Sequence, residues 1–427
     1  MIGLFRKIFK DRRGNILAIA GASLPLIIGA AGLATDTIQW TLWKRQLQRA
    51  ADSAAIAGVY DRSGASGATT NTSNAVSRDL SLNNRTWMGL KAGYPQIAFP
   101  ADSGVKTNQV QVTLAIQQSL PFSSLFMSAA PTIIAQSTAA SIPAGGDACV
   151  QALETISVTG ITNNGNATIN MPNCVMYSNS PSVNSASAGG SSEVNAKAIA
   201  AVGGIQQSNN WHVEQYIPYS PPLADPFANV TPDPSDMHCV GSALSDSTNF
   251  SSLPAGTNCF SSLSVGANKT LNVPANFGPI YINGGSADLK GAFNCSGCTI
   301  VLTNTDTSPT ATIGTISSNA QANNNITAPT TGTFTGIAIY QDRRATLSVD
   351  KINGGSNNII TGALYFPSQE LWVNGSGGST SLCAMFVARR IVFVGTSGIS
   401  LKGISESDCA GTGMPSSSAV RMVRLVA

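Results

Sequence analysis

The sequence predicts a mainly β protein that begins with one long helix, and three observations carry this prediction. An apolar run without a charge extends from Ile16 to Thr35. A helical pattern follows it from Thr37 to Gly58. Beyond Cys149, short apolar segments alternate with turns of Asn, Gly and Ser, which is typical of successive strands. We therefore expect a single transmembrane helix, a small α+β domain and a large β domain.

The composition supports a strand-and-turn architecture. The 427 residues leave room for two or three domains, and 43% of them are hydrophobic while only 11% are charged. Low charge with many small polar residues argues against a charged, helix-rich cytosolic enzyme. The net charge is +3, and no basic stripe follows the N-terminus. Binding of nucleic acid therefore has no electrostatic support.

The apolar run is long enough to cross a membrane. Its twenty residues span about 30 Å as a helix, and Pro25 in its middle is tolerated in membrane helices. Basic residues outnumber acidic ones ahead of the run, which places the N-terminus in the cytoplasm and the body outside. The sequence thus predicts a cytoplasmic basic tail at 1–15 and a transmembrane helix at 16–35.

Two kinds of cleavage are alternatives to a retained anchor. Gly32 and Ala34 have the spacing of a signal-peptidase site before Thr35. The run is longer than a usual export signal, however, and the helical pattern continues past it. A prepilin-type leader would have Gly14 at the cut and usually a glutamate five residues later, where Ile19 stands. We therefore expect a retained anchor.

The helix after the span has one apolar face that narrows to small residues: Trp43, Leu47, Ala50, Ala54 and Gly58. Such a face permits the close approach of a partner helix, or it covers a small core of the same chain. The sequence leaves both interpretations open.

The stretch from Arg12 to Gly58 resembles the N-terminal segment of TadG-like proteins of the bacterial Flp (tight adherence) pilus machinery. Shared features are Gly-Asn after the arginines, Pro inside the span, Gly-Leu-Ala-X-Asp at its exit and Gln-Leu-Gln-X-Ala-Ala-Asp-X-Ala-Ala beyond it. The positions that carry the resemblance are Gly14, Asn15, Pro25, Asp36, Gln46, Leu47, Ala50, Asp52 and Ala54. The resemblance implies a component anchored in the bacterial inner membrane that assembles or anchors an adhesive pilus. Its implied partners are other inner-membrane pilus-assembly proteins, pilin or the cell envelope.

Residues 36–143 are predicted to form a TadG-like helix with a small sheet. Val110, Val112 and Leu114 alternate with polar residues in one strand, and "PTIIAQSTAASI" predicts a second strand. This pair of strands, joined by a Phe-rich turn, recurs in Tad-type pilus-assembly proteins, so the resemblance implies a pilin-like α+β domain. Pro143 and a Gly-Gly linker are expected to close it.

Residues 149–427 are predicted to form an irregular parallel β-helix, because turns rich in Asn, unlike two-residue hairpin turns, separate the strands. An antiparallel β-sandwich is the alternative, since no strict repeat length emerges. A proline-rich insertion is expected at 208–260, where "PPLADPFANV" is either a partner-binding arm or the cover of an open edge. Segments such as "FNCSGCTIVLTN" also resemble a region often found behind the TadG-like segment.

All eight cysteines follow the apolar run: Cys149, Cys174, Cys239, Cys259, Cys295, Cys298, Cys383 and Cys409. An even number confined to the region beyond a membrane signal suggests disulfides in an oxidising compartment. Connectivity cannot be read from sequence. Closeness along the chain favours 149–174, 239–259, 295–298 and 383–409, and a mixture of bridges and buried free thiols is the alternative.

Few residues suggest a metal site or redox chemistry. His212 and His238 have no second pair of ligands beside them, although Cys239 follows the second histidine. Cys295 and Cys298 have the spacing of a redox motif but no thioredoxin-like context, so we expect a structural disulfide there.

The sequence also predicts no catalytic residues and no cofactor. It contains no Gly-X-Ser-X-Gly nucleophile elbow, and its acids are scattered. Asp342 and Arg344 would share one strand face, where an ion pair is the simpler interpretation. We therefore expect a membrane-anchored, non-enzymatic component of the Flp/Tad pilus assembly or adhesion machinery that binds proteins in the periplasm. The alternative is a secreted or surface β-helix protein that binds or cleaves polysaccharide.

Overall fold

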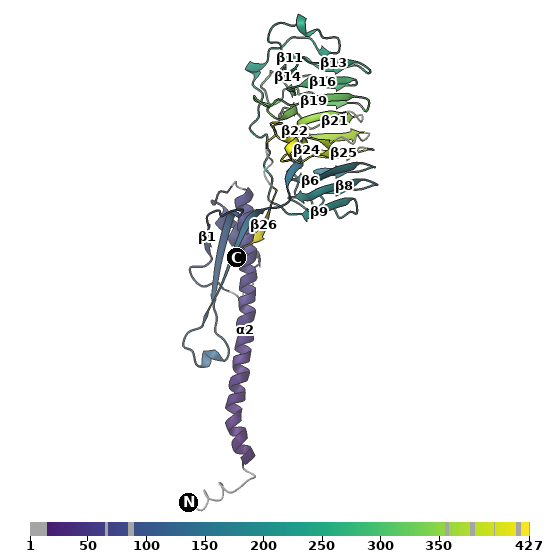
Figure 1. Cartoon of the computed structure of the whole chain (residues 1–427). Helices are drawn as coiled ribbons and strands as arrows, with labels where there is room; N and C mark the ends of the chain where they lie inside the picture. Colours follow the sequence, from purple (N-terminus) through teal and green to yellow (C-terminus); the bar gives the residue numbers. More distant parts are fainter. Residues whose placement is uncertain are drawn as a thin grey trace, which may run out of the picture. The chain divides into compact units, whose positions relative to one another are not determined.

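The computed structural model describes residues 15–64, 67–83, 89–354, 358–375, 381–396, 398–415 and 420–426. The chain divides into two compact units (Figure 1). Unit 1 comprises Met1–Ile142 and Val423–Ala427, and unit 2 comprises Pro143–Met422. The structure thus differs from the predicted division at the C-terminus, because the last residues join the first unit instead of the β domain.

Unit 1 is built on one continuous helix, α2 (Asn15–Gly64), which contains Pro25. The predicted span and the predicted helix beyond it are therefore one element. Within the described residues, α2 is long and apolar enough to cross a membrane, and the apolar part is almost entirely exposed. Three threonine hydroxyls near the end of the span donate to the carbonyl four residues earlier, at 2.6–2.9 Å. These bonds satisfy polar groups on an apolar surface.

A four-stranded sheet and a short helix pack against the C-terminal half of α2. The sheet has the order β1-β2-β3-β26, and β1, β2 and β3 pair in antiparallel fashion. Its members are β1 (Gln96–Ala98), β2 (Thr107–Gln117), β3 (Thr132–Pro143) and β26 (Arg421–Leu425), with η1 (Ser123–Leu125) between β2 and β3 and α3 (Thr72–Asn83) beside α2. The amide of Val426 donates to the carbonyl of Thr138 at 2.8 Å, which holds the C-terminal strand in this sheet.

The narrow apolar face of α2 covers the core of unit 1. Leu47 and Ala54 are fully buried and pack with Val110 and Val76. Of the two interpretations that the sequence left open, the structure shows cover of the chain's own core. Gly58 completes this face, because a Cβ there would stand 2.8 Å from Cγ1 of Val110.

Replacing Gly58 by leucine is expected to destabilise unit 1 by about 2 kcal/mol, because the added side chain has no room between α2 and β2. Gly29→Leu is the matched control, since no atom lies within 4 Å of a Cβ at Gly29 on the same helix. Limited proteolysis of the detergent-purified chain measures the effect. Equal protection of both variants would contradict the packing described above.

Unit 2 is one parallel sheet of 22 strands. Neighbouring strands pair in parallel wherever the structure describes both of them. The strands are β4 (Asp147–Ala152), β5 (Ile161–Asn163), β6 (Thr168–Ser178), β7 (Ala186–Ala188), β8 (Glu193–Ala201), β9 (Trp211–Ile217), β10 (Leu244–Ser245), β11 (Cys259–Phe260), β12 (Leu263–Val265), β13 (Thr270–Asn272), β14 (Gly278–Asn283), β15 (Ala287–Leu289), β16 (Ala292–Ser296), β17 (Cys298–Thr303), β18 (Ile316–Ser318), β19 (Asn323–Thr327), β20 (Ile337–Gln341), β21 (Val349–Gly354), β22 (Ile359–Gly375), β23 (Ser381–Leu382), β24 (Ala384–Val394) and β25 (Gly398–Leu401).

The strands stack in an order that differs from their order in the chain. Strands β10 to β24 follow one another through the stack, and β24 then pairs with β4 and β5. Strands β6, β8 and β9 continue beyond that point, so β9 and β10 lie at opposite ends (Figure 1). The residues between β9 and β10, 218–243, cross from one end of the stack to the other, and we call them the crossing segment.

The predicted insertion at 208–260 is therefore wrong at both of its ends. Strand β9 near its start and strands β10 and β11 near its end are members of the parallel sheet. Between these strands, the crossing segment and residues 246–258 lie outside the sheet. Their prolines and polar residues gave the whole region a loop-like composition. The polar stretch 305–332 carries two short strands, β18 and β19.

Four disulfides join cysteines of unit 2. They link Cys149 to Cys174, Cys239 to Cys259, Cys295 to Cys298 and Cys383 to Cys409, and none of the eight cysteines is free. These are the pairs that closeness along the chain favours. Cys295 and Cys298 lie at the junction of β16 and β17, where their bridge closes a turn between two strands.

Candidate functional site

The most distinctive polar site of unit 1 lies where α2 leaves the predicted span. Asp36 is buried, and its carboxylate accepts three hydrogen bonds from the loop between β2 and β3. The amide of Phe122 donates at 2.9 Å, and the amide and hydroxyl of Ser123 each donate at 2.5 Å. The loop is thus fastened to the helix by a side chain that the sequence singles out as a family position.

A glycine one turn earlier completes this contact. A Cβ at Gly32 would lie 2.2 Å from Cδ2 of Phe122, so only glycine allows the ring to lie against α2. The sequence indicates Gly32 only as a small residue with the spacing of the alternative cleavage site, and its contact with Phe122 is not visible there. The structure gives it a packing role.

The other family positions divide between the core and the surface. Leu47, Ala50 and Ala54 are buried in the core of unit 1, and the Asp52 carboxylate accepts a 2.9 Å hydrogen bond from Gln48. The remaining positions take no part in a shared cluster: Gln46 is half-buried, Pro25 is exposed, and Gly14 and the side chain of Asn15 lie outside the described residues.

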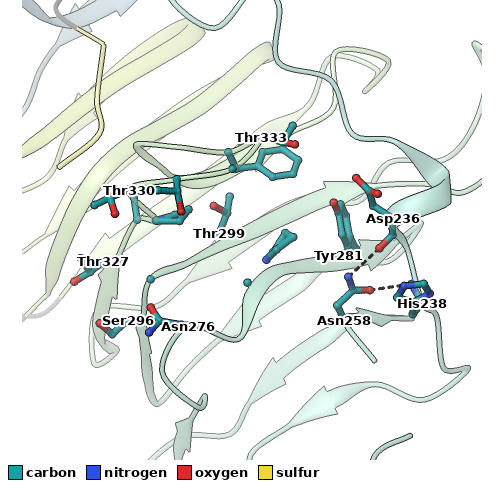
Figure 2. A pocket seen from close by; sticks show the side chains of 18 residues that line it. Asp236, His238, Asn258, Asn276, Tyr281, Ser296, Thr299, Thr327, Thr330 and Thr333 are labelled. Carbon is teal, nitrogen blue, oxygen red and sulfur yellow. Dashed lines mark hydrogen bonds between the residues drawn. The ribbon is translucent and has the colours of Figure 1, made fainter. Parts of the chain in front are cut away.

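Unit 2 contains a cavity of about 700 Å³ beside β14 and β17 (Figure 2). Hydroxyl and amide groups dominate its lining, with Tyr281 and Phe334 as its aromatic members. Asn258 fastens one side, because its Nδ2 donates to the carbonyl of Asp236 at 2.9 Å and its Oδ1 accepts from the amide of His238 at 2.8 Å. Burial and the nearby acids Asp236 and Asp233 raise the pKa of Tyr281 to about 12. The cavity offers hydrogen bonds to a neutral polar ligand.

The two histidines do not come together. His238 lines the cavity, whereas His212 is exposed on β9. Within the described ranges, no three side chains of His, Cys, Asp or Glu gather where they could hold a metal ion. Cys239, which follows His238, is bonded to Cys259.

The crossing segment is fastened to the sheet along its length. The side chain of Gln151 donates to the carbonyls of Leu223 and Ala224 at 3.1 and 3.0 Å. The Asp225 carboxylate accepts from Arg343 at 2.9 Å and from the Tyr365 hydroxyl at 2.8 Å. "PPLADPFANV" is therefore a cover for a sheet face, and its Asp225 carboxylate and the carbonyls of Leu223 and Ala224 are bonded within unit 2.

Aromatic rings support the same cover. Phe227 of the crossing segment meets the ring of Tyr365 edge to face at 5.3 Å, and Tyr365 stacks on Tyr340 at 5.4 Å. Tyr340 also donates from its hydroxyl to the carbonyl of Val230 at 3.0 Å. Edge-to-face and offset arrangements are the favourable ones for aromatic pairs.

Charged groups of unit 2 form ion pairs. Asp342 and Arg344 make the pair that the sequence favours, at 2.8 Å, and Asp342 also accepts from the Thr303 hydroxyl at 2.7 Å. Arg344 and Thr303 outweigh the effect of burial and hold the pKa of Asp342 below its ordinary value. These contacts describe a structural ion pair.

Asp350 is a buried carboxyl group of unit 2 that takes part in none of the ion pairs found among the described residues. Asp350 is fully buried, and its Oδ1 accepts from the amide of Ile316 at 2.6 Å. Its Oδ2 and the Oε1 of Gln341 lack a hydrogen-bond partner among the described residues. Burial raises the pKa of Asp350 from 3.8 to about 7. Between these values the native chain holds a proton that the unfolded chain releases, so this group makes unit 2 less stable as the pH rises.

Replacing Asp350 by asparagine is expected to raise the free energy of unfolding of unit 2 above pH 7 by on the order of 2 kcal/mol. Asparagine retains the acceptor for Ile316 and cannot ionise. Urea denaturation should show a gain that shrinks as the pH falls from about 7 toward 3.8. A gain of the same size throughout this range would contradict the raised pKa.

Comparison with known proteins identifies the N-terminal segment. Residues 14–66 match the family model described as putative Flp pilus-assembly TadE/G-like. No curated protein and no solved structure matches the chain. The matched residues include Asp36, the core face of α2 and Gly58. The chain therefore begins with a Tad segment of the TadE/G-like kind, which suggests involvement in Flp/Tad pilus assembly or adhesion.

Proposed function

We propose that the chain is a non-enzymatic component of the Flp/Tad pilus assembly or adhesion machinery, anchored in the bacterial inner membrane by α2. The observation that carries this proposal is the match of residues 14–66 to the TadE/G-like family model on a helix apolar enough to cross a membrane. The N-terminal tail lies in the cytoplasm and the body in the periplasm, as the basic residues ahead of the span favour.

The body acts in this proposal by binding proteins of the pilus machinery, pilin or the cell envelope. We propose an irregular parallel β-helix as the fold of unit 2, which its parallel pairing and stacked strands support. Four disulfides support the periplasmic location, because such bridges persist in oxidising compartments.

Deletion of the gene tests the function. Pili or adhesion should be lost, and the full chain supplied in trans should restore them. A chain exported by a cleavable signal in place of residues 1–35 should fail to restore them, although its body reaches the same compartment. Unchanged piliation in the deletion strain would remove the proposal.

Fractionation and thiol labelling test the topology. After a carbonate wash, the full chain should remain with the inner membrane. In intact cells all eight cysteines should resist alkylation until a reductant is added, because each is in a disulfide. Cysteines that react without reductant would place the body on the cytoplasmic side.

A secreted or surface protein that binds or cleaves polysaccharide is the second candidate, and the cavity beside β14 favours the binding form of it. Its hydroxyl and amide lining, with Tyr281 and Phe334, suits a neutral sugar chain. Retention of the detergent-solubilised chain on immobilised neutral polysaccharide should then be weakened by Thr333→Ala, since Thr333 lines the cavity. Equal retention of both forms, or none, would argue against this candidate.

A further inference from the structure

The loop between β2 and β3 presents apolar side chains to solvent, and we call residues 120–127 the hairpin tip. Leu125 is 73% exposed and Phe126 is 76% exposed, and Met127 beside them is exposed as well. No Asp, Glu, Lys or Arg occurs between Thr107 and Gly146, so the whole hairpin is uncharged. Three adjacent exposed apolar side chains in an uncharged loop indicate a contact surface.

The hairpin runs along α2 toward the predicted span, and its tip lies beside the helix (Figure 1). The contacts follow in order down the helix: Gly58 faces Val110, Gln48 donates to the carbonyl of Gln136, Asp36 accepts from Ser123, and Gly32 faces Phe122. At about 1.5 Å per helical residue, Gly32 lies about 5 Å inside a span that ends at Thr35. The tip therefore reaches the depth at which the span enters the membrane.

The backbone amides of the tip from Phe122 to Met127 all have partners within the protein. The amides of Phe122 and Ser123 donate to Asp36. The next four amides donate to carbonyls of the tip itself: Ser124 to Leu120, Leu125 to Phe122, and both Phe126 and Met127 to Ser123, at 2.8–3.1 Å. A segment in contact with lipid must satisfy its backbone polar groups internally. An ordinary surface loop has no such requirement.

One aromatic residue of α2 near this level, Trp40, has the exposure expected at a membrane interface. Trp40, one helical turn beyond Asp36, is 43% exposed. Tryptophan is enriched where a membrane meets water, because its ring is apolar and its N–H can bond to water. Lys44, another turn along, donates from its Nζ to the carbonyl of Ile134 on the hairpin. The interface thus lies between the tip and Lys44, the first basic residue of the helix beyond the span.

We propose that the hairpin tip inserts Leu125, Phe126 and Met127 into the leaflet at which α2 leaves the membrane, so that the lipid bilayer is the ligand of this surface. This inference rests on the proposed anchoring by α2 and assigns a second membrane contact to unit 1. Apolar side chains at this depth enter the boundary between headgroups and acyl chains by about 5–10 Å. The tip and the helix together fix the height and rotation of unit 1 on the membrane.

Depth measurement on the full chain in vesicles tests this. A single cysteine introduced by Leu125→Cys carries an environment-sensitive fluorophore, and the native cysteines do not compete because all are in disulfides. The vesicles contain phosphatidylcholine and phosphatidylglycerol, with spin-labelled lipid as the quencher. Ile28→Cys is the control within the span, and Val105→Cys is the control for an exposed apolar position beyond the sheet, at 64% exposure.

The expected result is a blue-shifted label at position 125 that loses fluorescence in spin-labelled vesicles, as the label at 28 does and the label at 105 does not. A label at 125 that behaves like that at 105 and is quenched by aqueous iodide would overturn the inference. A protein partner would then be the remaining occupant, since pure lipid vesicles contain none. If the label at position 28 is also quenched by aqueous iodide and not by spin-labelled lipid, the anchoring by α2 is wrong. This result is distinguishable from a failure of tip insertion alone.

Discussion

Unit 2 is expected to lose about 3 kcal/mol of its free energy of unfolding when Gly314 is replaced by alanine. A Cβ at Gly314 would lie 1.8 Å from the carbonyl oxygen of Gly285 and 2.3 Å from its carbonyl carbon. Gly285 in turn would place a Cβ 1.9 Å from the carbonyl oxygen of Ser261. Ser261, Gly285 and Gly314 occupy the same place in successive layers of the sheet. Each lies two residues before a paired strand residue: Leu263 pairs with Ala287, and Ala287 pairs with Ile316. Backbone meets backbone there, so no flexible side chain can move aside.

Chemical denaturation of the oxidised, detergent-purified chain, followed by the β-sheet signal in circular dichroism, measures this effect. Gly241→Ala is the matched control in the same unit, because no atom lies within 4 Å of a Cβ at Gly241. It should leave the midpoint unchanged. If both variants unfold at the same denaturant concentration, the close approach of the layers at Gly314 is wrong.

The second large effect is expected at Glu154. Its replacement by glutamine should lower the free energy of unfolding of unit 2 by about 3 kcal/mol near neutral pH. The Glu154 carboxylate is almost completely buried and accepts from Nε of Arg389 at 3.0 Å and from Nε of Arg390 at 2.7 Å. Its other oxygen accepts from the amides of Thr155 and Ile156. Glutamine has nearly the same shape but leaves two partly buried guanidinium groups without their counter-charge.

This effect should depend on pH in the opposite sense to that of Asp350. Burial raises the pKa of Glu154, but the Ile156 amide, Arg390 and Arg389 outweigh it and hold the pKa below the ordinary value of 4.5. The stabilisation is therefore complete above pH 4.5 and is lost as the pH falls through the folded value. The difference in free energy of unfolding between the native chain and the Glu154→Gln variant should therefore disappear as the pH falls through that acidic range.

Asp288→Ala provides the comparison for Glu154. Asp288 pairs with Lys290 at 2.7 Å, closer than most ion pairs of the described residues, but both side chains are about half exposed. Water screens such a pair, so its loss should change stability by less than about 1 kcal/mol. Chemical denaturation of the Glu154→Gln and Asp288→Ala variants at neutral and acidic pH measures the two losses of stability. An equal loss in both would mean that burial does not strengthen the Glu154 cluster.

The features that the sequence predicts well are those encoded over short distances. The apolar run and the small-residue face that follows it lie in one helix, because helical periodicity depends on neighbours three and four residues apart. The alternation at Val110 to Leu114 predicts β2, where the partner strand follows within the same hairpin. The favoured cysteine pairs are likewise separated by at most 26 residues.

Contacts between distant residues could not be predicted in this way. Asp36 was recognised as a family position, but its partner Ser123 lies 87 residues later, in a loop whose sequence shows only a few serines and phenylalanines. Strand β26 joins a sheet whose other strands end at Pro143. Glu154 and its two arginines are more than 230 residues apart. Such pairs depend on the register of long-range strand pairing, which local periodicity does not encode.

The stacking order of unit 2 has a consequence for how the chain is made. Strand β4 is among the first strands of unit 2 to emerge during synthesis, yet its neighbour β24 begins only at Ala384. Until then, the early strands β4 to β9 expose an unpaired edge on the side that β24 will cover, and β10 starts a second, separate stack. The two stacks join only when nearly the whole polypeptide has been synthesised. Completion of the fold is therefore tied to completion of synthesis, and a chain that stops before Ala384 presents open strand edges to protease and to other chains.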